Sequence, residues 1–179
     1  MKKIGLIVLT FVALILIGGL FVPTKQEFEK KITIDASHVM VWDEISTFEK
    51  RQAWSPWKTY DPEMKTTLEG PDGKVGTKFS WKSDHERVGW GSQTFTFMDK
   101  ANYIETKMEF QKPHEGEGKS YMSLNSNVDG CEVTWGFNFE IPYPINAIMA
   151  IMPEDKSIDK DFTDGLKKLK AICESRRTR

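Results

Sequence analysis

The chain has 179 residues, 39% of them hydrophobic and 28% charged, a balance typical of one globular domain with a short appendage. Its formal net charge of -1 provides no concentrated basic surface, so we expect no nucleic acid as a partner. Neither Cys131 nor Cys173 belongs to a CxxC pair, which argues against structural zinc. We expect both as buried free thiols, with a disulfide between them as the alternative.

The N-terminal segment is apolar and uncharged from residue 4 to residue 22. As a helix rising about 1.5 Å per residue, it would span roughly 28 Å, close to a hydrocarbon core of about 30 Å. Lys2 and Lys3 precede it, which predicts a cytoplasmic N-terminus. A cleaved signal peptide is the alternative, but its apolar region usually has about 7 to 15 residues. We predict a single-pass membrane protein with an anchor and linker over residues 1–24 and an extracytoplasmic domain over residues 25–179.

The first part of this domain combines a strand with short helices. Residues 27–34 alternate between apolar and polar, which predicts a half-buried strand. Ser37 is a suitable N-cap for the segment that follows. Apolar residues spaced four and three apart predict one amphipathic helix over residues 38–48. Residues 49–57 then form a short aromatic helix or turn, which we expect Pro56 to stop.

The middle of the chain, from residue 64 to residue 141, consists of alternating segments separated by polar turns. This pattern predicts an antiparallel meander with one apolar and one solvated face. Gly89 and Gly91 indicate a bulge or bend in the strand over residues 88–98. The clearest alternation is the last, over residues 131–141.

The C-terminal segment predicts a long amphipathic helix, because its apolar residues recur three and four positions apart. These residues are Ile158, Phe162, Leu166, Leu169 and Ile172. Such a helix needs an apolar partner, and the inner face of the sheet is the large one available. The fold class is therefore α+β, with a curved antiparallel sheet around the C-terminal helix.

Several separated segments also match one family pattern, in order along the chain. They are ITIDA at 32–36 before VW at 41–42, WSPW at 54–57, GP at 70–71 followed by VGT at 75–77, VGWGS at 88–92, and KDFTDGLKKLK at 160–170. Together they resemble the bacterial SRPBCC (START-like, polyketide cyclase/dehydrase-type) family, including its membrane-anchored members, over about residues 27–175. The resemblance implies the helix-grip fold, in which an antiparallel sheet grips a long C-terminal helix around a hydrophobic cavity. Activities in the family range from lipid carriage to polyketide cyclisation and stress sensing, so function is less constrained than fold.

The predicted inner face is rich in aromatic and methionine side chains, which suit a roomy apolar cavity because they repack around varied ligands. The alternative is a solid core packed against the C-terminal helix. We predict a cavity with these ligand-binding residues: Phe79, Trp81, Phe95, Phe97, Met108, Phe110, Met122, Trp135, Phe137, Phe139, Phe162 and Leu166. Trp54 and Trp57 are expected to plug the edge of the fold, although Trp57 could instead line the cavity.

The segment between the last strand and the last helix, residues 142–153, is bounded by prolines. Ile145, Ile148, Met149 and Met152 recur in it at helical spacing. Three interpretations are open: a lid over the cavity mouth, packing against the sheet, or contact with a bilayer.

Catalytic patterns are sparse. His38, His85 and His114 lie at a helix start and in two polar turns. His85 and His114 could share one rim with neighbouring carboxylates, but we expect solvated turn residues, and we predict no catalytic residue, metal or cofactor.

The leading hypothesis is a membrane-anchored module that binds a hydrophobic small molecule or lipid without chemistry of its own. The second is a cyclase or dehydratase type of enzyme, which would require a titratable residue facing the cavity. The third is a membrane-proximal interaction or stress protein with a filled core.

Overall fold

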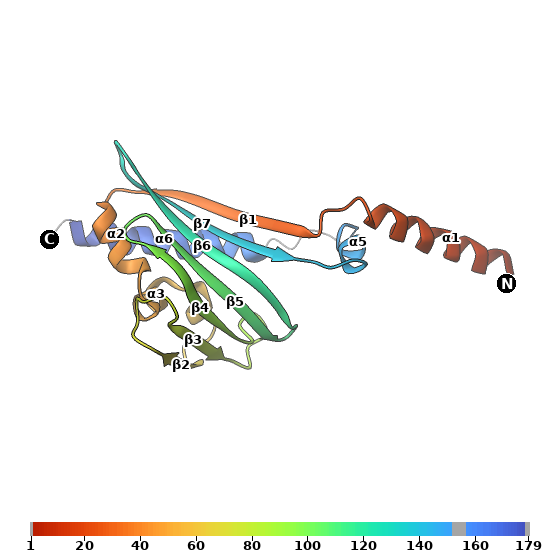
Figure 1. Cartoon of the computed structure of the whole chain (residues 1–179), viewed down its shortest axis with the longest axis horizontal. Coiled ribbons are helices and arrows are strands. Elements are labelled where there is room, and N and C mark those ends of the chain that lie inside the picture. Colours follow the sequence, from red (N-terminus) through yellow and green to blue (C-terminus); the bar gives the residue numbers. More distant parts are fainter. Residues whose placement is uncertain (1, 152–156, 178–179) are drawn as a thin grey trace.

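The computed structural model describes residues 2–151 and 157–177. Its centre is one seven-stranded antiparallel sheet with the strand order β1-β7-β6-β5-β4-β3-β2 (Figure 1). The strands are β1 Lys25–Ile34, β2 Lys65–Glu69, β3 Lys78–Lys82, β4 Trp90–Asp99, β5 Tyr103–Lys112, β6 Gly116–Asn127 and β7 Gly130–Glu140. Strands β2 to β7 follow one another as a meander, as the alternating segments predict, and β1 pairs with β7.

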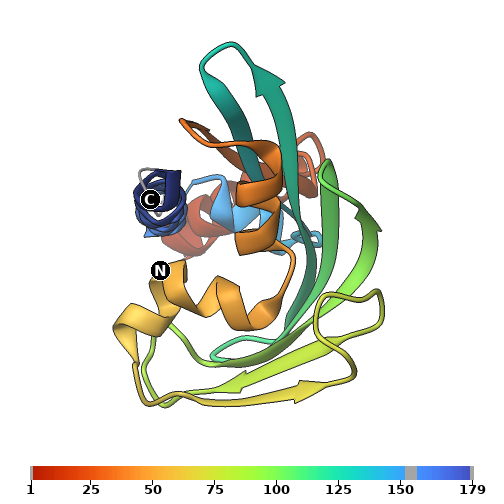
Figure 2. The ribbon, with the colours of Figure 1, turned by 90° about the vertical axis from the view of Figure 1, so that its left-hand side faces the viewer.

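The long C-terminal helix α6, Ser157–Arg177, lies along the concave face of the sheet. Helices α2 His38–Ile45, α3 Phe48–Trp54 and α4 Pro56–Tyr60 connect β1 to β2 and occupy the same side. Figure 2 shows the sheet curving around α6 and these short helices. The helix-grip arrangement is therefore confirmed.

The short helices differ from the prediction of one helix over residues 38–48. A second helix begins at Phe48, because Thr47 caps it and the Asp72 carboxylate accepts hydrogen bonds from Phe48 N and Glu49 N, both at 2.9 Å. The prediction that Pro56 stops the helical segment over residues 49–57 also needs correction. Pro56 stands in the first turn of α4 behind the N-cap Ser55, where a missing N–H costs nothing.

Strand β4 contains two irregularities in its pairing with β5. One lies between Trp90 and Gly91, as the nearby glycines predict, and the other lies between Phe95 and Phe97. The second shift changes which side chains face inward: Phe95 is completely buried, whereas Phe97 is 53% exposed. The prediction that Phe97 faces the cavity is wrong, because the extra residue in the strand turns it to the outer face.

Helix α1 spans Lys2–Gly19, and residues 20–22 form turns beyond it. No helix in the described part of the chain is long and apolar enough to cross a membrane. The helical apolar stretch from residue 4 to Gly19 rises only about 24 Å, short of the roughly 30 Å required. The predicted single-pass localisation, with an extracytoplasmic domain, is therefore wrong, and the membrane contact predicted through residues 4–22 is not supported.

Helix α5, Ile145–Met149, packs beside the end of α1 (Figure 1). The side-chain amide of Asn146 donates hydrogen bonds to Gly19 O and Val22 O, both at 3.0 Å. None of the three interpretations of this segment includes that contact. Met152 and Pro153, which belong to the same predicted segment, lie outside the described residues.

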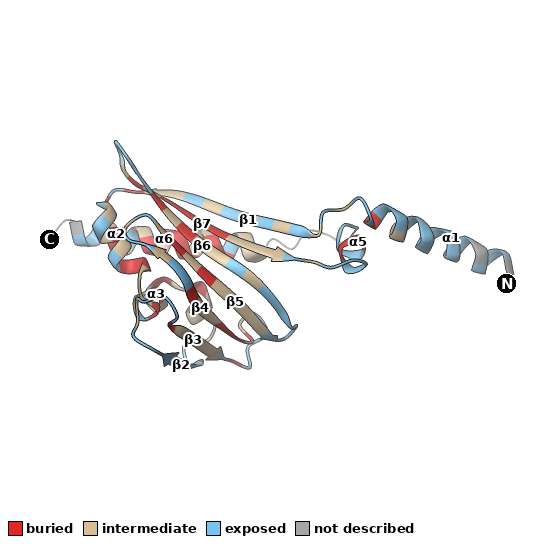
Figure 3. Cartoon of the chain, viewed as in Figure 1, coloured by how far each residue is buried: buried red, intermediate tan, exposed pale blue. Residues whose placement is uncertain are grey.

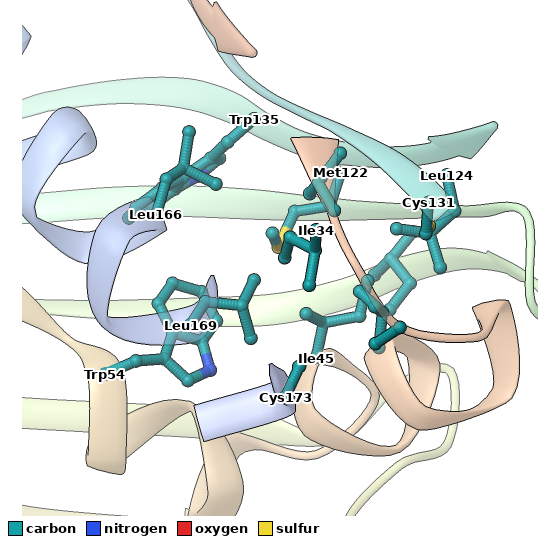
Figure 4. Packing of buried hydrophobic residues seen from close by; sticks show 14 of the residues in the cluster. Ile34, Ile45, Trp54, Met122, Leu124, Cys131, Trp135, Leu166, Leu169 and Cys173 are labelled. Atoms are coloured by element: carbon teal, nitrogen blue, oxygen red, sulfur yellow. The ribbon is translucent and has the colours of Figure 1, made fainter. Parts of the chain in front are cut away.

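The core lies between the inner face of the sheet, α2, α3 and α6 (Figure 3). Near the C-terminal half of α6 it is filled by aliphatic and sulfur side chains, which Figure 4 shows in contact. Ile34, Ile45, Leu169, Cys131 and Cys173 are all fully buried there. Both cysteines are free thiols, and burial raises the pKa of Cys131 to about 11 and that of Cys173 to about 12.

Candidate functional site

A cavity of about 440 Å³ lies between the inner face of the sheet, α3, α4 and the first half of α6. This volume falls within the range of small-molecule sites, roughly 300–1,000 Å³. Its wall includes these predicted residues: Phe79, Trp81, Met108, Phe110, Trp135, Phe137 and Phe162. Their role in ligand binding stays a prediction.

The other predicted residues lie elsewhere. Phe95 is stacked on Phe48 at 3.9 Å in the solid core, and Met122 and Leu166 are buried in the same core cluster. Phe139 stacks on Phe137, 5.2 Å away, beyond the cavity wall. Phe97 is on the outer face.

The wall contains aromatic rings in both stacked and edge-to-face contacts. Trp135 stacks on Phe162 at 4.1 Å, while Trp54 and Trp57 approach Trp135 edge-on at 5.3 and 5.9 Å. Both Trp54 and Trp57 also line the cavity. The predicted cavity therefore exists, at the aromatic end of the inner face.

The indole N–H groups of Trp54, Trp81 and Trp135 in the wall are bonded within the protein. Trp135 Nε1 donates to Ser120 Oγ at 3.0 Å, and this hydroxyl donates to Gly136 O at 3.1 Å. Trp81 Nε1 donates to Val88 O at 3.1 Å. Gly91 leaves room for the Trp81 ring, since a Cβ at this position would lie 2.6 Å from it. These contacts present mainly hydrocarbon surface to the cavity.

Polar side chains of the wall are absent from the predicted site, among them Arg51 and Gln93. Arg51 of α3 is only 9% exposed and donates from Nε to Ile45 O at 2.6 Å. Gln93 of β4 pairs with Phe79 and Met108, which places it on the inner face. The spacing of Arg51, three residues after Phe48 and three before Trp54, was the signal that puts it on a buried helix face.

Burial lowers the pKa of Arg51 to about 9, and the charge of Asp72 opposes this shift. The guanidinium is therefore still charged near pH 7. It lies over the Phe95 ring, with Cζ 4.9 Å from the centroid.

A rim cluster of Tyr60, Arg87 and Asp161 borders the cavity. The buried Asp161 carboxylate accepts a hydrogen bond from Tyr60 OH at 2.5 Å and from Arg87 Nη2 at 3.0 Å. Arg87 also stacks over the Tyr60 ring, 4.4 Å from its centroid. The hydrogen bond to Asp161 raises the pKa of Tyr60, with a smaller contribution from burial. The cluster joins α4, α6 and the turn before β4.

The histidines are also near this rim. His114 belongs to the cavity lining, together with Lys112 and Glu86, whereas His85 stacks on Tyr60 at 5.8 Å. Within residues 2–151 and 157–177, no group of three or more His, Cys, Asp or Glu side chains could hold a metal ion.

The sequence model of the family described as polyketide cyclase / dehydrase and lipid transport matches residues 25–174. The chain belongs to this family. The family resemblance found in the sequence is therefore confirmed, while its membrane-anchored subdivision is not supported. No curated protein has a sequence that matches this polyketide cyclase/dehydrase and lipid transport family member.

Solved structures share the fold of this family member. A protein from Chromobacterium violaceum aligns with a TM-score of 0.59 and 16% identity, covering 83% of this chain and 96% of its own. The di-domain ARO/CYC StfQ of the steffimycin biosynthetic pathway gives 0.64 and 11%, covering 87% and 53%. Ginseng major latex-like protein 151 from Panax ginseng gives 0.58 and 13%, covering 84% and 98%. At these identities the likeness establishes the fold alone.

Proposed function

We propose that this protein binds a hydrophobic small molecule in the cavity between the sheet and α6. The observation that carries the proposal is a cavity of about 440 Å³ lined by many aromatic side chains, in which the indole N–H groups of Trp54, Trp81 and Trp135 are bonded within the protein. Burial of an apolar ligand there contributes about 25 cal/mol per Å², before the costs of ordering are subtracted. The family description, which includes lipid transport, supports the same class of ligand. A filled core, as the interaction-protein hypothesis requires, is disfavoured by this volume.

A cyclase-like enzyme is the second candidate, because more titratable groups line the cavity than the sequence suggested. Arg51, Asp161 and His114 all contribute to the wall. A general base must be free to accept a proton from the substrate. Asp161 is engaged by Tyr60 and Arg87, and an arginine acts only as a donor, so Glu86 and His114 are the remaining candidates in the wall. The name of StfQ, an ARO/CYC, is consistent with this alternative. Binding without chemistry remains the better-supported function.

The test is a fluorescence titration of the full chain with N-phenyl-naphthylamine, a neutral apolar probe. We expect saturable binding that Met108→Trp weakens at least tenfold, because the larger side chain occupies the cavity. Phe97→Trp is the matched control, since it adds similar bulk on the outer face. Absence of binding, or equal binding by both variants, would contradict the proposal.

A further inference from the structure

We infer that the ligand of this cavity is an apolar molecule bearing one carboxylate, and that this carboxylate binds the guanidinium of Arg51. The inference rests on the proposed function and specifies its ligand class. It starts from the position of Arg51, a cation that is only 9% exposed and lies in a cavity wall containing both aromatic and polar side chains.

Arg51 lacks a charged partner. Its Nε bond to Ile45 O is the one hydrogen bond that the described residues provide, and its Nη2 is buried without a partner. Asp72, the carboxylate whose charge acts on it, instead accepts hydrogen bonds from Phe48 N and Glu49 N. No described carboxylate forms an ion pair with Arg51. A buried guanidinium without an anionic partner is energetically costly. A ligand group that supplies the missing negative charge and hydrogen bonds therefore contributes strongly to binding.

The side chain is also held in place before any ligand arrives. The backbone carbonyl of Ile45 fixes Nε, and the rings of Phe95 and Phe48 support the guanidinium plane, with centroids 4.9 and 5.7 Å from Cζ. The terminal nitrogens therefore form a positioned fork. Its natural counterpart is a planar group with two oxygens, which a carboxylate provides.

The other basic groups of the wall are compensated in other ways. Arg87 is bonded to Asp161, whereas Lys112 and His114 are exposed to solvent. Among the described residues, Arg51 is thus the buried cation of the wall with which an anionic ligand would form an ion pair. A single unpaired cation matches a monoanion better than a phosphate dianion, because the second charge would be buried without compensation.

Gln93 offers a second polar contact. It lies on the inner face between Phe79 and Met108, and its side-chain amide has no hydrogen-bond partner within the described residues. An amide can donate to a carboxylate oxygen or bond another polar substituent of the ligand. The rest of the wall is suited to a ring system or a folded chain.

The experiment compares two probes with the same apolar body, pyrenebutanoate and pyrenebutanol, on the full chain at pH 7. We expect the acid to bind at least about tenfold more tightly than the alcohol, the effect of a charge-assisted hydrogen bond in a buried site. Arg51→Met should remove this preference. Lys82→Met is the matched control, because it removes a cation of strand β3 that lies outside the cavity wall, and it should keep the preference.

Equal affinities for acid and alcohol would overturn the inference while leaving the proposed function intact. Failure of both probes to bind would contradict the proposed function itself. Loss of the preference in Lys112→Met but not in Arg51→Met would assign the anion to the rim and overturn the inference. If Arg51→Met does not fold, the Arg51 Nε–H signal of the wild-type protein decides. It should shift with the acid and not with the alcohol, and an unchanged signal would refute the contact.

Discussion

The two halves of α6 face differently filled regions of the same sheet. Around Leu169 and Cys173, branched and sulfur-containing side chains leave a solid core, whereas around Phe162 flat rings enclose about 440 Å³. Both regions follow the same alternation along the strands. The comparison shows that periodicity indicates which side chains point inward but does not determine whether the interior is full or hollow.

The largest expected effect concerns two phenylalanines that flank the bulge in β4. Phe95→Ala should destabilise the protein by about 3–5 kcal/mol, because it removes a fully buried ring from the solid region. Phe97→Ala should change stability by less than about 0.5 kcal/mol, because that ring is on the outer face. Urea unfolding of the two variants measures both values. Similar losses of stability in the two variants would mean that the bulge does not place Phe95 and Phe97 on opposite faces of the sheet.

A second pair compares the solid and hollow regions directly. Leu169→Ala should cost about 2–5 kcal/mol, since it opens a void in a close-packed core. Phe137→Ala should cost less, about 2 kcal/mol or below, because its ring is only partly buried and already borders empty space. Thermal and urea unfolding test this order. If Phe137→Ala proves the more damaging change, the hollow region is packed in solution.

The rim cluster should have a smaller effect, dependent on pH. Asp161→Asn weakens the contacts to Tyr60 and Arg87, and we expect a loss of about 1 kcal/mol. The raised pKa of Tyr60 stabilises the fold below the ordinary tyrosine pKa of about 10, and this contribution disappears as pH rises through the higher folded value. In Asp161→Asn the pKa of Tyr60 should fall towards its ordinary value. Ultraviolet titration, with Tyr60→Phe as the reference, measures the change.

The smallest effect concerns the reactivity of the two buried thiols in the solid region. This prediction concerns their rate of alkylation and involves no change in the stability of the protein. Cys131 and Cys173 have pKa values raised to about 11 and 12 by burial, so little thiolate is present at pH 8. Iodoacetamide should therefore modify the native protein far more slowly than the urea-unfolded protein. Rapid modification of either cysteine in the native state would show that this end of the core opens readily.

The sequence was sufficient for the sheet, the C-terminal helix and the family, because strand alternation and the stripe ending in Leu169 and Ile172 are local patterns. It was insufficient where distant contacts decide. The break before Phe48 depends on Asp72, which lies 24 residues further along the chain. Phe97 points outward because of a bulge between Phe95 and Phe97. The sequence does not reveal this bulge, because the two aromatic residues fit a regular alternation.

The candidate site was predicted in part for the same reason. Rings such as Trp81 and Phe137 were identified from alternation alone, but α3 adds Arg51 to the wall from outside the sheet. An arginine in a short helix is ordinarily assigned to the surface, and the neighbours that bury it were visible only in its spacing from Phe48 and Trp54. The N-terminal segment was misjudged because its apolar composition extends past Gly19, where the helix ends.

The strand order has a consequence for how such proteins diversify. Strands β1 and β2 are the two edges of the sheet, so the connection from residue 35 to residue 64 must travel across its hollow side. Strands β2 to β7 pair with one another in chain order through successive antiparallel ladders. Replacement of this single crossover would exchange Arg51, Trp54 and Trp57 together, and so change what the protein accepts while its frame stays constant.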